Sequence, residues 1–110
     1  MGGISRGGEW ALLVAAAHPD VFGASGAHSP AVGSSASSAP VLATELASKD
    51  LRIWLDVGTS DALSANIGAL DVALSARGVN HVFRPAPGAH DGGYWQSRVA
   101  DYLRWYTADW

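Results

Sequence analysis

Apolar residues recur near the start of the chain with the spacing of one helical face. They lie three and four positions apart, at Trp10, Leu13, Val14 and Ala17. This spacing predicts an amphipathic helix whose apolar stripe faces a core. The helix should end at His18, because the proline that follows disfavours helical geometry in the residue before it.

Two later apolar runs predict strands. The stronger run covers residues 51–57 and ends at Gly58, which is typical of a buried strand bounded by a turn residue. The weaker run covers residues 21–27 and contains mainly small side chains. Between the two, residues 31–40 are rich in serine and alanine and predict a loop, and residues 44–48 predict a helical turn.

The second half of the chain predicts two helices and one further strand. The first of these helices has apolar residues at helical spacing, at Leu63, Ile67, Leu70 and Leu74. It should end at Arg77 and Gly78, since glycine is favoured just beyond a helix C-terminus. Residues 81–84 predict a strand closed by Pro85, and a loop follows it. The last helix should present one apolar and aromatic face, formed by Trp95, Val99, Tyr102, Leu103 and Tyr106.

The order of these elements defines the expected fold class. Helices and strands alternate along 110 residues, which is the length of one small domain. Such alternation predicts an α/β fold in which a short parallel sheet is flanked by crossover helices. We expect residues 1–110 to form this single domain.

Composition and charge exclude several classes of function. The net charge is −3, which disfavours nucleic acid and anionic membrane surfaces as partners. The absence of cysteine excludes disulfides, thiolate metal sites and a cysteine nucleophile. The longest apolar run, residues 10–17, is too short to cross a bilayer, and no signal-peptide pattern is visible. The compartment stays open, with the cytoplasm as the default expectation.

A G-x-S-x-G pattern at residues 3–7 stands directly before the first predicted helix. This pattern is typical of a nucleophile elbow, a tight strand-to-helix turn that exposes a reactive serine, here Ser5. Side chains at Gly3 and Gly7 are expected to collide with neighbouring backbone, which explains glycine at both positions. The backbone N–H of Arg6, at the helix N-terminus, would then point at a developing oxyanion.

A serine nucleophile needs a base and an acid that orients the base. Asp61 follows the strand at residues 51–57, and His90 follows the last predicted strand. The chain order serine, aspartate, histidine is the one expected of a doubly wound serine hydrolase. Both side chains should lie at the carboxyl ends of parallel strands, where the sites of open α/β sheets gather.

Other roles for the acidic and basic residues stay open. Asp61 could simply cap the helix that follows it. Asp56 is a rival acid, although it lies inside a strand, where a carboxylate needs a partner. His28 is the alternative base, or it could line a substrate pocket together with Tyr94 and Trp95. No two histidines have the H-x-x-x-H spacing of a metal site, so no metal is predicted.

Four segments of the chain resemble successive blocks of one family: "GISRGG", "HPDVFGASGAHSP", "LDVGTSD" and "PGAHDGGYW". The chain resembles the C-terminal half of an α/β-hydrolase of the putative-esterase type, the group that holds esterase D, feruloyl esterases and enterochelin esterases. The resemblance covers essentially all 110 residues. It implies Ser5 as the nucleophile, Asp61 as the acid and His90 as the base. It also implies a serine carboxylesterase that hydrolyses small, short-chain esters without a cofactor.

The same resemblance leaves a second class of function open. The family has further strands before the elbow, so these residues could form a non-catalytic remnant that acts as an assembly or interaction module. An open sheet edge at or near residues 21–27 would expose unpaired backbone groups. The last helix adds large aromatic side chains that favour association, namely Trp95, Tyr102, Trp105, Tyr106 and Trp110. We therefore expect a homo-oligomer, and a dimer in particular.

Overall fold

A four-stranded parallel sheet forms the centre of the computed structural model, which describes residues 1–33 and 35–110. Ser34, within the predicted loop at residues 31–40, lies outside the described residues. Each strand pairs with the next one along the chain, in the order β1 (Gly2–Ile4), β2 (Ala24–His28), β3 (Arg52–Gly58) and β4 (Val82–Ala86). The predicted α/β class with a short parallel sheet is confirmed.

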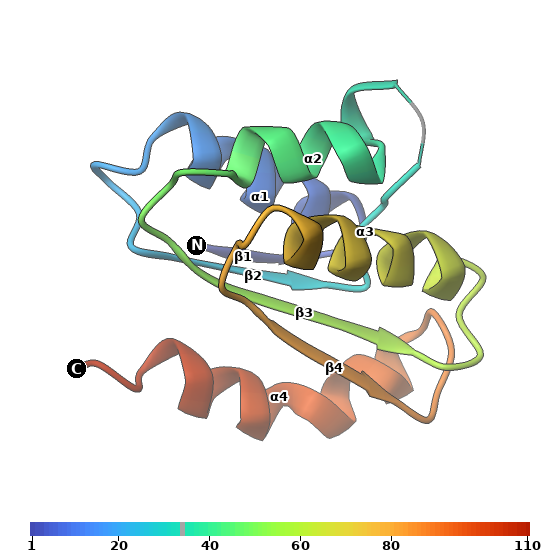
Figure 1. Ribbon diagram of the computed structural model, residues 1–110. Coiled ribbons are helices and arrows are strands. Elements are labelled where there is room, and N and C mark those ends of the chain that lie inside the picture. Colours follow the sequence, from blue (N-terminus) through green and yellow to red (C-terminus); the bar gives the residue numbers. More distant parts are fainter. Residues whose placement is uncertain (34) are drawn as a thin grey trace.

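Helices cover both faces of this sheet (Figure 1). One face carries α1 (Arg6–Ala17), α2 (Ala39–Leu46) and α3 (Ser64–Ala76), and a short 3₁₀ turn at Ser35–Ser37 precedes α2. The opposite face carries α4 (Gly92–Tyr106). Two neighbouring parallel strands must be joined by a crossover connection, and such connections are right-handed. Because each strand here lies beside the previous one in the same direction across the sheet, the three crossover helices lie on the same face.

The hydrophobic core lies between the sheet and these three helices. Alternate side chains of β3 enter it, namely Ile53, Leu55 and Val57, and each is almost fully buried. The intervening side chains face the other way, and Trp54 contacts aromatic rings of α4. Because strand side chains alternate between faces, β3 supplies both layers of packing.

The face of α1 that was predicted to be buried is not the face that packs on the sheet. Trp10 is 56% exposed and Ala17 is also exposed. The face that packs on the sheet instead contains small residues, including Gly8, Ala11 and Ala15. Leu12 on the same face is fully buried, so this face combines one large apolar side chain with small residues that let the helix backbone approach the sheet closely.

Two predicted boundaries need correction. The helical turn expected at residues 44–48 is the end of α2, which already begins at Ala39. Pro40 lies in the first turn of α2. Backbone N–H groups in a first turn have no acceptor within the helix, so proline, which lacks an N–H, loses no hydrogen bond there. Pro85, expected to close the last strand, lies inside β4, which tolerates proline because it is an edge strand.

The predicted face of the last helix is confirmed for four of its five residues, which line one groove beside β1: Val99, Tyr102, Leu103 and Tyr106. Tyr102 is buried there, whereas Val99 and Leu103 are exposed. One open edge of the sheet is β1, and β2, whose region was expected at or near an edge, lies one strand further in.

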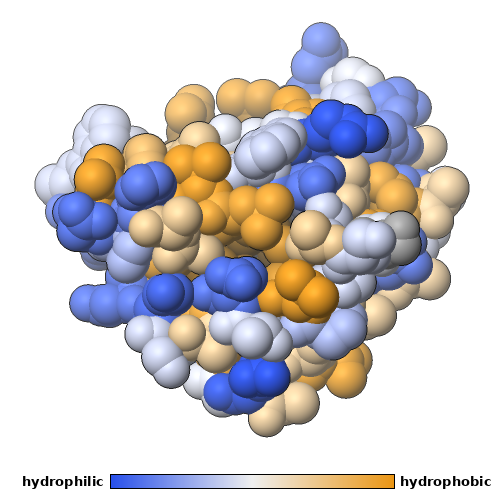
Figure 2. Space-filling model, turned by 90° about the horizontal axis from the view of Figure 1, so that it is seen from above, coloured by the Kyte–Doolittle hydropathy of each residue, from blue (hydrophilic) through white to orange (hydrophobic). Residues whose placement is uncertain are grey.

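No helix within the described residues has the length and apolar character needed to cross a membrane. Over α1, α2 and α3, hydrophobic patches lie between hydrophilic residues (Figure 2).

Candidate active site

Ser5 forms the turn between β1 and α1. Its backbone has φ 56° and ψ −119°, a strained conformation for a residue with a side chain. The turn is fixed by the Ser5 N–H, which donates to the carbonyl oxygen of His28 at 2.9 Å, and by the Ser5 carbonyl, which accepts from Gly8, Glu9 and Ala31. Such a turn lifts the serine side chain out of the sheet, as expected for a nucleophile elbow.

Close backbone packing explains one of the two predicted elbow glycines. A side chain at Gly3 would collide with the backbone of Gly7 and Gly8. The steric expectation for Gly7 is wrong, because a side chain there would meet open space. Gly8 takes that role instead, since a Cβ atom on it would lie against the Gly3 carbonyl oxygen and the turn after β2.

The structure brings Ser5, His90 and Asp61 into one chain of hydrogen bonds. The Ser5 hydroxyl lies 2.9 Å from His90 Nε2, and His90 Nδ1 lies 2.7 Å from Asp61 Oδ2. A proton on Nδ1 donates to the carboxylate and leaves Nε2 free to accept from the serine. This is the arrangement in which a serine can be deprotonated as it attacks.

Asp61 faces His90 and also bonds to the turn before α3, although the N-cap of that helix is Leu63. Its Oδ1 accepts from the N–H of Leu63 at 2.8 Å, just before α3 begins, while Oδ2 faces His90. The Asp61 side chain is 1% exposed, whereas the His90 side chain is 35% exposed. The carboxylate is therefore shielded from solvent with both of its oxygens hydrogen-bonded, whereas part of the imidazole is exposed to solvent.

The loops that carry the acid and the base are packed against each other. A side chain at Gly58, where β3 ends, would collide with the backbone of Gly88. Two backbone hydrogen bonds join the same loops, from Thr59 N–H to Ala86 O at 2.9 Å and from Ser60 N–H to Gly88 O at 2.8 Å. The distance between Asp61 and His90 is thus set by main-chain contacts.

The first residue of α1 provides a candidate oxyanion donor. Arg6 follows Ser5 directly, and its N–H has no intrahelical acceptor because it lies in the first turn. The positive end of the helix dipole adds to the attraction for a negative oxygen at this position.

The rival acid, Asp56, lies in a separate buried cluster. It is fully buried, and its Oδ1 accepts from His28 Nδ1 at 2.6 Å and from Trp54 Nε1 at 2.9 Å. Its Oδ2 accepts from the hydroxyls of Tyr94 and Tyr102, each at 2.6 Å. The structure pairs Asp56 with His28 and Asp61 with His90, so the two alternatives belong to two different hydrogen-bond networks.

Burial and the charge of Asp56 together raise the pKa of the tyrosines around it. Burial acts to raise the pKa of Asp56, but hydrogen bonds from His28, Tyr102 and Tyr94 outweigh it and hold this pKa below its ordinary value. Burial and the nearby carboxylate raise the pKa of Tyr94 and Tyr102 far above the usual range. Burial and the same charge raise the pKa of Tyr106 to about 12. All three hydroxyls therefore keep their protons at neutral pH.

The three candidate pocket residues have different surroundings. Tyr94 is 3% exposed and bonded to Asp56, so a substrate does not reach it. His28 is also buried and stacks on Tyr102 at 3.7 Å between ring centroids, yet it lines an apolar groove between β1 and α4, away from the three proposed triad residues. Trp95 alone lies against His90, with ring centroids 5.0 Å apart. Within residues 1–33 and 35–110, no three acidic or histidine side chains gather as metal ligands would.

Sequence reasoning missed most of the buried cluster. The alternation of side chains in β3 places Trp54 and Asp56 on one face, and this was the sequence signal that could have indicated their contact. The donors of His28, Tyr94 and Tyr102 come from other elements, so their convergence depends on how α4 crosses the sheet.

A parallel α/β sheet whose first turn presents a serine to a histidine and an aspartate belongs to the α/β-hydrolase class of folds. Residues 1–106 match the model of the Esterase family, described as "Putative esterase", and the chain belongs to this family. A search of the curated proteins finds no match.

Several of the similar solved structures are esterases and hydrolases about twice as long. A ferulic acid esterase matches with a TM-score of 0.77 and 23% identity, covering 94% of this chain and 49% of that one. The S-formylglutathione hydrolase FrmB from Staphylococcus aureus matches with a TM-score of 0.82 and 20% identity, covering 94% and 49%. FphF, a fluorophosphonate-binding serine hydrolase of Staphylococcus aureus, matches with a TM-score of 0.77 and 18% identity, covering 94% and 52%. At these identities the likeness shows the fold, and the chain spans about half the length of these neighbours.

Proposed function

We propose that this chain hydrolyses small, short-chain carboxylic esters through an acyl-enzyme on Ser5. The observation that carries the proposal is the continuous hydrogen-bond chain from Ser5 through His90 to Asp61. Membership of the Esterase family and the fold shared with esterases support it. The reaction needs no cofactor, because the serine, the imidazole and the carboxylate supply nucleophile, base and orienting acid.

The proposed reaction has two halves. In the first, Ser5 Oγ bonds to the ester carbonyl carbon while its proton moves to His90 Nε2, and the carbonyl oxygen becomes an oxyanion facing the Arg6 N–H. The bond to the alkoxy group then breaks, and His90 returns the proton to the departing alcohol. In the second half, water attacks the acyl-enzyme with the same proton path, releasing the acid and free Ser5. Asp61 stabilises the imidazolium that forms in each half.

Covalent labelling tests the nucleophile directly. A fluorophosphonate probe should form one bond between phosphorus and Ser5 Oγ with loss of fluoride, because His90 accepts the hydroxyl proton as the bond forms. Intact-mass and peptide spectrometry should find one adduct per chain, located on Ser5. The Ser5→Ala variant should stay unlabelled, and so should wild type after acid unfolding. A folded wild-type chain that stays unlabelled would contradict the proposal.

A second candidate function follows from an apolar groove at the open edge of the sheet. The groove has a volume of about 800 Å³, lies between β1 and α4, and its lining contains none of the three proposed triad residues. Several exposed apolar side chains line it: Met1, Ile4, Val99, Leu103 and Trp110. We propose a second copy of this chain as its occupant, since one β1 edge can pair with another about a two-fold axis. The chain would then act as a self-assembling module.

Light scattering at micromolar concentration tests this assembly. We expect a dimer, because burying the groove removes exposed apolar surface from water. Leu103→Glu should give a monomer by placing a charge in the groove. Val72→Glu, on the exposed face of α3, serves as the matched control and should leave the dimer intact. A stable wild-type monomer would exclude the second copy as occupant.

A further inference from the structure

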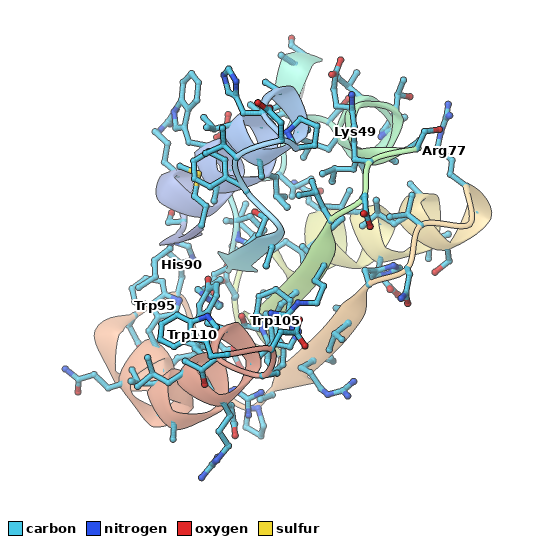
Figure 3. All side chains as sticks on the ribbon, turned by 90° about the vertical axis from the view of Figure 1, so that its left-hand side faces the viewer. Lys49, Arg77, His90, Trp95, Trp105 and Trp110 are labelled. Atoms are coloured by element: carbon cyan, nitrogen blue, oxygen red, sulfur yellow. The ribbon has the colours of Figure 1, made fainter. Side chains whose placement is uncertain are left out.

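The imidazole of His90 has a neighbour besides Ser5 and Asp61. The indole of Trp95 stands nearly perpendicular to it, at 81° and 5.0 Å between ring centroids, and Figure 3 shows the two side by side near α4. The hydrogen bond to Asp61 restrains one nitrogen of the ring and leaves the ring free to tilt about that bond. The indole blocks tilting on one side, so it restrains a motion that Asp61 does not.

Trp95 is itself anchored to the turn after β2. Its Nε1–H donates to the hydroxyl oxygen of Ser29 at 3.0 Å. Ser29 is fully buried, and its N–H donates to the carbonyl oxygen of Asp56 at 2.8 Å. Its backbone is left-handed, with φ 49°, a conformation that a serine adopts at some cost. The anchor is therefore rigid and held in place by the central strand β3.

The same turn also holds the serine. The carbonyl oxygen of His28, the residue before Ser29, accepts the N–H of Ser5 at 2.9 Å. One short piece of backbone thus fixes Ser5 on one side and, through Ser29 and Trp95, the ring of His90 on the other. We infer that Ser29 and Trp95 are positioning residues that hold His90 Nε2 in line with Ser5 Oγ. The inference rests on the proposed function, because it assigns roles within that same site.

Removing either partner of this contact should slow turnover without weakening substrate binding. We expect Ser29→Ala and Trp95→Phe each to lower kcat about ten- to a hundredfold, because a small misplacement of a reacting group has effects of this size. KM for a short-chain chromogenic ester should stay unchanged. The double variant should fall no further than the single ones, because each change breaks the same hydrogen bond.

Two further variants separate positioning from folding. Ser29→Gly removes the hydroxyl but suits the left-handed backbone, so it should keep the fold and still lose kcat. Ser25→Ala is the matched control, because Ser25 is equally buried in β2 and its hydroxyl has no hydrogen-bond partner among the described residues. It should retain the wild-type kcat.

A readout without turnover keeps this inference separate from the proposed function. In proton NMR, the His90 Nδ1–H signal should exchange faster with water in Ser29→Ala and Trp95→Phe than in wild type and Ser25→Ala. Unchanged exchange in both variants would overturn the inference, as would additive losses of kcat in the double variant. If wild type hydrolyses no ester, the proposed function fails and the NMR comparison still decides the positioning role.

Discussion

Replacing Asp61 with asparagine should lower kcat for a short-chain ester about 10⁴-fold, the size of effect expected when a catalytic histidine is held in the wrong tautomer. The Leu63 N–H donates to Oδ1 at 2.8 Å, so it selects the asparagine orientation that keeps oxygen on that side. The amide NH₂ group then faces His90 Nδ1, which must accept. The ring proton moves to Nε2, and Nε2 can no longer take the proton of Ser5.

Initial hydrolysis rates of a chromogenic ester measure this loss. Asp71→Asn is a matched control, because Asp71 makes the same kind of contact, 2.7 Å from His81 Nε2, outside the proposed triad. Its kcat should equal that of wild type. An Asp61→Asn variant within tenfold of wild type would show that Asp61 does not fix the tautomer of His90.

Replacing Asp56 with asparagine should lower the free energy of unfolding by about 3–5 kcal/mol, the cost of breaking a buried charged contact. All four polar neighbours of this side chain donate hydrogen bonds to it: His28, Trp54, Tyr94 and Tyr102. An amide offers one oxygen and adds two donors, so some buried donors lose their acceptor. The loss is large beside the total stability of a small domain, about 5–15 kcal/mol.

Urea unfolding at neutral pH measures this effect. Asp101→Asn is the control, because Asp101 is itself exposed and its ion pairs are with Arg104, which is exposed, and Arg98, which is partly buried, so the loss should be about 0.5 kcal/mol or less. A loss below about 1 kcal/mol for Asp56→Asn would contradict the importance given to the buried cluster.

The Asp56 cluster also predicts the response to acid. Hydrogen bonding, acting against burial, leaves the pKa of Asp56 in the folded chain below its ordinary value of 3.8. Its stabilising effect is therefore complete above pH 3.8 and is lost as the pH falls through the lower, folded pKa. Wild type should lose urea resistance in this acid range. Asp56→Asn should lack that component, and Asp101→Asn should keep it.

Much of the fold could be predicted from local patterns. The strand at residues 51–57 and the apolar spacing of α3 are strong signals, and Gly78 does end α3 with a positive φ of 69°. The phase of α1 could not be predicted, because hydrophobicity points to Trp10 whereas close packing selects Gly8 and its small neighbours. The start of α2 was hidden by a serine-rich stretch whose helix forms through burial of Leu42 and Leu46.

In the candidate site, too, some residues could be selected from the sequence and other contacts could not. Chain order and strand ends were enough to select Ser5, Asp61 and His90, which the structure places in contact, while their catalytic roles stay a prediction. The contact of Trp95 with Ser29 joins residues 66 positions apart. No local pattern encodes such a pair, because it exists only once α4 has packed beside the end of β2.

The close approach of Gly58 and Gly88 has a mechanical consequence. The acid loop and the base loop form one joined unit, because their main chains touch and share two hydrogen bonds. Ser5 lies outside this unit, in the turn between β1 and α1. The spacing of His90 and Asp61 therefore depends on this pair of loops alone, whereas the spacing of Ser5 and His90 also depends on the turn that holds Ser5 at His28 and Trp95 at Ser29. Engineering that exchanges one of the two loops must transplant both, and a change to the serine turn must keep its backbone contacts with His28 and Ala31.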